Sequence, residues 1–134
     1  MQIDSMEGRG VRGLLRLEGL ALLAASVVLY AQTGAGWMLF AVLFLVPDLS
    51  FAFYAFGARA GAVAYNTMHS TIGPFLLAAA SRAVPNAPLP LLGAALIWFA
   101  HVGFDRALGY GLKYATGFGH THLGRIGRAR LAAA

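Results

Sequence analysis

Four long apolar segments constrain the fold of this chain more than any other feature. They lie at about 14–33, 37–56, 63–82 and 89–112 of the 134 residues. A helix needs about 20 predominantly apolar residues to cross the hydrocarbon core of a bilayer, so each segment is long enough to span one. We therefore expect an all-α integral-membrane protein.

The composition agrees with this expectation. Hydrophobic residues make up 59% of the chain and charged residues 11%, which leaves too little polar surface to cover a soluble fold. Turn-forming residues separate the segments in "TGAGW", "GARAG" and "VPNAPLP". Because these connections are short, sequential helices should be antiparallel neighbours. The sequence predicts one transmembrane domain over 1–134, folded as an antiparallel four-helix bundle.

The basic residues predict the orientation of the helices. All but one of the ten lysines and arginines lie before the first span, between the second and third, or near and after the end of the fourth, and Arg82 alone lies on the other side. By the positive-inside rule, both termini and the basic tail at 113–134 should be cytoplasmic, in a bacterial inner membrane. Basic flanks can also bind nucleic acid, but around an apolar core they favour membrane lipids as partners and no nucleic acid.

Every expected span carries at least one polar residue, although an ionised group costs about 2.5–3.5 kcal/mol at the centre of a membrane helix. Depths estimated from a rise of about 1.5 Å per residue place these residues in the cytoplasmic half of all four helices. We therefore expect a single polar site that faces the cytoplasm. The residues are Glu18 in the first span, Asp48 in the second, Asn66 and His69 in the third, and His101, Asp105 and Arg106 in the fourth.

The spacing of these residues indicates a divalent metal. His101 and Asp105 lie four positions apart, and Asn66 and His69 three apart, so each pair shares one helix face. Pro47 should kink the second span beside the site. Imidazoles and carboxylates suit zinc, manganese or iron, whereas the lack of cysteine excludes a thiolate site. The expected metal ligands are Asp48, His69, His101 and Asp105.

Other polar residues near the expected site are candidates for catalysis and substrate binding. Glu18 is the candidate general base, and Arg106 would neutralise carboxylates or hold an anionic group of the substrate. Asn66 and Tyr110 are candidate substrate-binding residues, and Tyr65 could orient a ligand.

Structural roles remain open for the same residues. His101 and Asp105 could form an intrahelical hydrogen bond with Arg106 as counter-ion, and Asn66 could hydrogen-bond between helices. Tyr65 and Tyr110 could be interfacial belt residues.

Several stretches carry a resemblance to a known family: "LRLEGL", "PDLSF", "YNTMHSTIGP", and "HVGFDRALGYGLKY" with "THLG" after it. They resemble an uncharacterised family of small bacterial membrane proteins, domain-of-unknown-function family 4260. The resemblance covers nearly the whole chain, and its most specific part is the last stretch. That family has no assigned activity, so the resemblance implies no reaction.

A more distant resemblance implies a function. Pro47-Asp48, then His69-Ser70, then His101 with Asp105 follow the order of motifs in the YdjM-type inner-membrane metal-dependent hydrolases. The resemblance implies metal-ligand roles for the aspartates and histidines of these motifs. The chain lacks an early histidine of that family, and Asn66 stands near the place of its His-Arg pair.

Three function hypotheses follow. The first is a metal-dependent hydrolase of a lipid or phosphate ester at the cytoplasmic leaflet. The second is a small carrier or ion-handling protein, which would need to assemble as a homo-oligomer because four short spans are few for a transporter. The third is an accessory subunit in which the polar cluster only holds the helices together. An outer half without acidic or histidine residues favours the one-sided enzyme.

Overall fold

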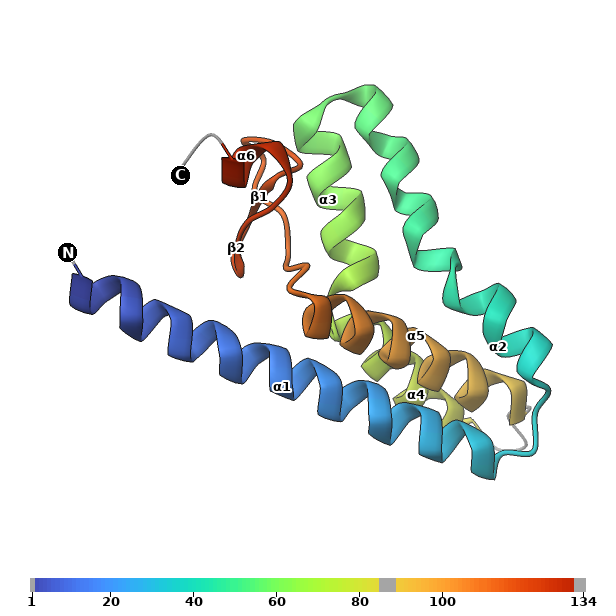
Figure 1. Ribbon diagram of the computed structural model, residues 1–134. Helices are drawn as coiled ribbons and strands as arrows, with labels where there is room; N and C mark the ends of the chain where they lie inside the picture. Colours follow the sequence, from blue (N-terminus) through green and yellow to red (C-terminus); the bar gives the residue numbers. More distant parts are fainter. Residues whose placement is uncertain (1, 85–88, 132–134) are drawn as a thin grey trace.

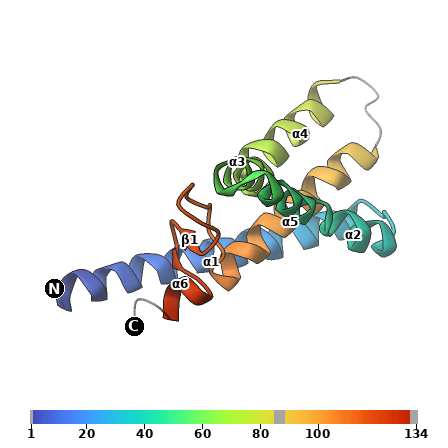
Figure 2. The same ribbon diagram turned by 90° about the horizontal axis from the view of Figure 1, so that it is seen from above.

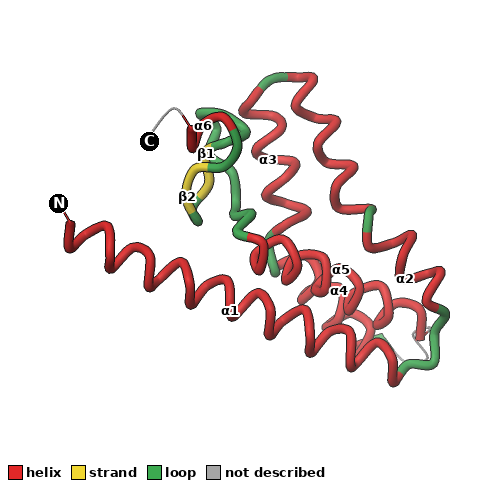
Figure 3. Tube along the Cα trace, in the orientation of Figure 1, coloured by secondary structure: helices red, strands yellow, loops and turns green. Residues whose placement is uncertain are grey.

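The computed structural model describes residues 2–84 and 89–131 and is mostly helical, as the tube view shows (Figure 3). The elements are α1 (Gln2–Gln32), α2 (Trp37–Phe44), a 3-10 helix η1 (Val46–Phe56), α3 (Ala58–His69), α4 (Ile72–Ala83), α5 (Leu89–Leu108), a short hairpin of β1 (His120–Thr121) and β2 (Gly124–Arg125), and α6 (Arg128–Leu131).

Three helical segments are long and apolar enough to cross a membrane. They are Gly8–Gln32, Trp37–Phe56 and Pro90–Leu108. Large apolar side chains on these segments, such as Leu17 and Met38, are exposed at the surface of the protein. Exposed apolar surface over whole helices is expected where lipid is the solvent. The expectation of a mostly helical chain with helices long and apolar enough to span a membrane is therefore confirmed.

The expected span at 63–82 is not one continuous helix, and the predicted four-helix bundle is not confirmed. Helix α3 ends at His69, Ser70 is extended with φ −81° and ψ 156°, and α4 begins only at Ile72. Each helix has 12 residues, or about 18 Å of length, which is less than the hydrocarbon thickness of about 30 Å. Pro74 explains the break, since a proline ring clashes with the carbonyl four residues before it in a continuous helix.

Helix α5 is central to the fold and packs against α1, α2 and α4 (Figures 1 and 2). Helices α1 and α5 cross at Gly19 and Gly103. A Cβ added at Gly103 would lie 2.7 Å from the carbonyl oxygen of Gly19, so the two backbones are in direct contact. Further along, Tyr30 lies beside Gly93, which shows that the two helices run in opposite directions.

The second candidate span changes helix type at Pro47, which confirms the expected proline distortion. Helix α2 ends at Phe44, and the chain continues from Val46 as a 3-10 helix of 11 residues. Such helices seldom exceed four residues, so a long one marks a strained part of the chain. Gly57, with φ 107°, then turns the chain into α3, and η1 packs against α3 as a hairpin (Figure 1).

The expected basic tail folds back onto α3. Lys113 pairs with Thr121 in an antiparallel bridge, and the N–H of His122 donates to the carbonyl of Leu112 over 3.1 Å. The amide of Asn66 in α3 holds the backbone of Lys113 at both polar atoms. It donates to the carbonyl over 2.9 Å and accepts from the N–H over 2.7 Å. The tail is therefore docked beside the end of α3.

Candidate metal centre

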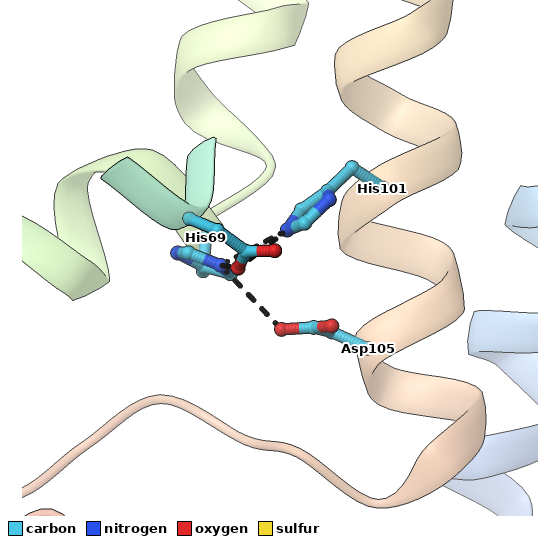
Figure 4. A group of neighbouring side chains, drawn as sticks. His69, His101 and Asp105 are labelled. Atoms are coloured by element: carbon cyan, nitrogen blue, oxygen red, sulfur yellow. Dashed lines mark hydrogen bonds and ion pairs between the residues drawn. The ribbon is translucent and has the colours of Figure 1, made fainter. Parts of the chain in front are cut away.

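Three elements bring the four expected metal ligands together. Asp48 lies in the first turn of η1, His69 is the last residue of α3, and His101 and Asp105 lie one turn apart on α5. Each offers one ligand atom, and these atoms all lie within 4.8 Å of one another. Figure 4 shows His101 and Asp105 directed from α5 toward His69. The expectation that these polar faces meet is confirmed for α5, α3 and η1.

The separations between the ligand atoms suit a metal ion. His69 Nε2 lies 3.0 Å from His101 Nε2, 3.5 Å from Asp48 Oδ1 and 3.4 Å from Asp105 Oδ2. His101 Nε2 lies 3.5 Å from Asp48 Oδ1. Ligands at about 2.0–2.2 Å from a tetrahedral zinc ion are roughly 3.3–3.6 Å apart. The group could therefore accept an ion with little movement of its side chains.

The group is closed on one side and open on the other. The side chains of His69 and His101 are 3% and 2% exposed, and that of Asp105 is 14% exposed. Asp48 is 39% exposed. The histidines are thus shielded while one carboxylate ligand reaches the surface, so a small molecule can approach the group from the side of Asp48.

Tyr65 orients two of the four ligands. Its backbone carbonyl lies 2.9 Å from His69 Nδ1, and its ring stacks on the imidazole with the centroids 3.7 Å apart. Its hydroxyl donates to Asp105 Oδ2 over 2.9 Å. A carbonyl can only accept, so Nδ1 of His69 carries the proton and Nε2 presents a lone pair to the group. The sequence placed Tyr65 near the site but left its role open.

The contact between the two histidines requires a proton from His101. Because Nε2 of His69 has none, the N–H in their 3.0 Å hydrogen bond belongs to His101 Nε2. His101 Nδ1 is then buried without a partner, one of three such side-chain atoms in the described part of the chain. An unpaired buried group costs about 1–3 kcal/mol. The two histidines therefore share one proton between their Nε2 atoms, and a cation could take the place of this proton.

Lys113 lies next to the group and is not recognisable from the sequence, where it reads only as a basic flank. It is 4% exposed, and its Nζ lies 3.8 Å from the ring centroid of Phe118 and 4.8 Å from that of Tyr65. Burial lowers the pKa of the ammonium to about 8, and the nearby carboxylate of Asp105 partly opposes this shift. A lysine with such a pKa can carry or give up a proton near neutral pH.

Hydrogen bonds hold the break between α3 and α4 in place. The indole N–H of Trp98 in α5 donates to the carbonyl of Met68 over 2.6 Å, and the N–H of Ser70 donates to the carbonyl of Asn66 over 2.9 Å. Gly73 leaves room for the Trp98 ring. The break thus fixes His69 at a helix end, where its side chain points to α5.

The structure does not bring Glu18 or Arg106 to the group. Glu18 is exposed on α1. The Cβ of Arg106 lies 2.7 Å from the position of a Cβ added at Gly19, so Arg106 starts from the side of α5 that packs on α1. With about 100° per residue, that side faces away from His101 and Asp105. Helix α5 therefore separates α1 from the group.

The two expected substrate-binding residues also lie outside the group. Tyr110 follows the end of α5 and is exposed. Asn66 has its amide engaged with the backbone of Lys113, as described above. The tail histidines make local contacts, since His120 Nδ1 lies 2.8 Å from Thr116 Oγ1 and His122 Nδ1 accepts from the N–H of Leu112.

The apolar helices indicate a membrane protein, and its His/Asp group could hold a metal ion. The chain belongs to the family described as domain of unknown function DUF4260, whose model matches residues 12–126. This match confirms the resemblance seen in the sequence and covers all four residues of the group. No curated protein and no solved structure matches the chain. The resemblance to YdjM-type hydrolases is therefore not shown.

Proposed function

We propose that this membrane protein binds one divalent cation through Asp48, His69, His101 and Asp105 and uses it to hydrolyse a lipid or phosphate ester. The observation that carries the proposal is the convergence of four ligand atoms from three elements within 4.8 Å. Two imidazoles and two carboxylates favour zinc, manganese or iron.

The partial exposure of the group favours catalysis over a purely structural ion. A structural zinc site is closed by its four ligands, whereas a catalytic site keeps a position for water or substrate. Asp48 is 39% exposed, so the group is not closed at this residue. When bound, the ion would lower the pKa of a water molecule and polarise the scissile group.

The residues around the group supply orientation and charge for this reaction. Tyr65 fixes both His69 and Asp105 through its carbonyl and its hydroxyl. Lys113, buried beside Tyr65, is placed to exchange a proton or to attract an anionic ester. Glu18 and Arg106 do not enter the proposal because they lie on the α1 side of α5.

The charge pattern supports a location in a bacterial inner membrane with both termini in the cytoplasm. All the basic residues except Arg82 fall on the side where the first span begins and the last one ends. On this orientation the group opens toward the cytoplasmic leaflet, where a lipid or phosphate ester would reach Asp48.

A second candidate function is cation handling without hydrolysis. The break between α3 and α4 lies directly beside His69. Interrupted membrane helices of this kind line the ion sites of many transporters. In this alternative the chain would assemble as a homo-oligomer, and the bound ion would exchange with the medium.

Metal analysis of the detergent-purified full chain tests the proposal. We expect about one zinc, manganese or iron ion per chain in the wild type, and none in His101→Ala or Asp105→Ala. His122→Ala and Glu18→Gln are matched controls, since they remove a histidine and a carboxylate outside the group. Equal metal content in all the variants would refute the metal centre.

Turnover separates the two functions once the metal is found. The metal-loaded wild type should hydrolyse a chromogenic phosphate or carboxylate ester, and His101→Ala should not. Bound metal with no hydrolysis, but with metal exchange across proteoliposomes, would exclude the hydrolase and support cation handling.

A further inference from the structure

A half-open cavity lies at one end of the molecule, apart from the candidate metal centre. It has a volume of about 710 Å³ and is lined by the start of α1, the end of α5 and the C-terminal hairpin. None of the four candidate metal ligands lines it. Its polar lining is basic and consists of Arg9, Arg12, Arg16 and Arg125.

The arginines reach the cavity from two distant parts of the chain. Arg9, Arg12 and Arg16 are three and four positions apart, which places them along one face of α1. Arg125 belongs to β2. A Cβ added at Gly124, beside it, would lie 3.7 Å from Cδ of Arg12, so the hairpin lies close to the stem of that arginine. The fold thus gathers four guanidinium groups around one space.

The described side chains, which begin at Gly8, place no carboxylate against these arginines. Among the residues whose side chains the structure describes, no carboxylate oxygen lies within 4.0 Å of an arginine nitrogen of this cavity. Arg16 donates from Nε to the carbonyl of Ala107 over 2.9 Å, which fixes its side chain and leaves its terminal N–H groups for a ligand. Clustered like charges repel unless an anion offsets them, and the guanidinium fork matches the oxygens of a phosphate.

The position of the cavity identifies the source of the phosphate. It lies where the candidate span Gly8–Gln32 begins and Pro90–Leu108 ends. The first of these has 25 residues, or about 37 Å, which exceeds the hydrocarbon thickness of about 30 Å. Its first turns therefore reach the headgroup level. Val11 and Leu14, between the arginines, are exposed apolar residues that acyl chains can cover.

We propose that this cavity binds the phosphate of an anionic membrane lipid, with the headgroup between Arg12 and Arg125 and the acyl chains along α1. The site does not depend on the metal centre or on hydrolysis. The basic start of α1 and the C-terminal hairpin would then bind lipid, in addition to orienting the chain in the membrane.

Native mass spectrometry of the full chain in mild detergent tests this site, with phosphatidylglycerol and phosphatidylcholine as probes. The wild type should retain phosphatidylglycerol in preference to phosphatidylcholine. The double variant Arg12→Gln/Arg125→Gln should bind phosphatidylglycerol about 30-fold more weakly, because each basic residue near a lipid surface contributes about fivefold. Arg82→Gln removes the same charge from an exposed position in α4 and should leave binding unchanged.

Three results would overturn the proposal: equal retention of the two lipids, equal losses in Arg82→Gln, or displacement of phosphatidylglycerol by millimolar inorganic phosphate. The last result would assign the cavity to free phosphate. If the double variant fails to fold, Arg9→Gln is the second test. Its side chain is exposed, and its loss should weaken lipid binding about fivefold.

Discussion

Tyr65 connects a histidine and a carboxylate of the candidate metal centre, so its hydroxyl is a direct test of how the ligands are oriented. We predict that Tyr65→Phe weakens metal binding about 10-fold to 100-fold, the usual effect of losing a hydrogen bond to a ligand. The hydroxyl lies 2.9 Å from Asp105 Oδ2, and the phenylalanine keeps the ring stacked on His69. Competition with a chromogenic chelator in detergent measures the change.

Tyr110→Phe is the matched control, because Tyr110 is exposed and outside the group. It should bind the metal as tightly as the wild type. An unchanged affinity in Tyr65→Phe would show that Asp105 needs no support from this hydroxyl.

Individual ligands could be predicted from the sequence where a local pattern encodes them. The four-residue spacing of His101 and Asp105 places both on one face of a helix, and the structure has them there. Glu18 could not be judged in the same way. Its depth along the membrane follows from counting residues, but its direction around the helix depends on how α1 packs. The contact of Gly19 with Gly103 turns Glu18 away from the group.

At the scale of the elements, the crossing of α1 and α5 depends on two glycines. We predict that Gly103→Val lowers the free energy of unfolding by about 1–3 kcal/mol, the usual cost of overpacking. A Cβ at Gly103 would lie 2.6 Å from the backbone nitrogen of Leu23 and 2.7 Å from the carbonyl oxygen of Gly19. Since both are backbone atoms, the helices would have to separate. Thermal unfolding in detergent measures the loss.

Gly93→Ala is the control on the same helix. Its added Cβ would meet only the ring of Tyr30, at an ordinary distance of 3.5 Å, so stability should be unchanged or slightly higher. If Gly103→Val were as stable as Gly93→Ala, the close crossing of α1 and α5 would be refuted.

At the scale of the elements, hydropathy does not predict the break between α3 and α4. The apolar character of 63–82 is nearly continuous, so it predicts one span, although Pro74 interrupts the helical hydrogen bonds and Ser70 becomes extended. The break is stable because Trp98, 30 residues away, donates to the carbonyl of Met68. No local pattern reports such a contact. The change of helix type at Pro47, by contrast, follows from the proline itself.

At the scale of the whole molecule, the chain's one lysine links stability to pH. The pKa of Lys113 is lowered to about 8 in the folded protein from the ordinary 10.5. Between these values the unfolded chain holds a proton that the folded chain has lost, so stability rises as the pH increases from about 8 to 10.5. Below about 8 both states are protonated, and the full cost of the buried ammonium is present.

Thermal unfolding midpoints measured across this pH range in detergent check the prediction. Lys113→Met keeps a side chain of similar length without a titrating group, and its midpoint should lack this rise. A parallel rise in the wild type and in Lys113→Met would assign the effect to other groups.

The class of fold follows from composition and hydropathy alone, because lipid exposure requires long apolar helices whatever their packing. The docking of the tail does not, since it depends on contacts such as the one between Asn66 and the backbone of Lys113, 47 residues apart. From the sequence, the amide of Asn66 could bind either a substrate or a backbone. Only the folded structure shows that it binds the backbone of Lys113.

The contact between the start of α1 and the C-terminal hairpin also limits how the chain can be threaded through a bilayer. A Cβ added at Gly124 would lie 3.7 Å from Cδ of Arg12, so the start of α1 and the hairpin lie close together at one end of the fold. A chain that returns to its starting face makes an even number of crossings. Since the three candidate spans are an odd number, the proposed orientation with both termini in the cytoplasm requires the broken pair α3 and α4 to make one more passage. On that orientation, the unwound step beside His69 would lie inside the bilayer.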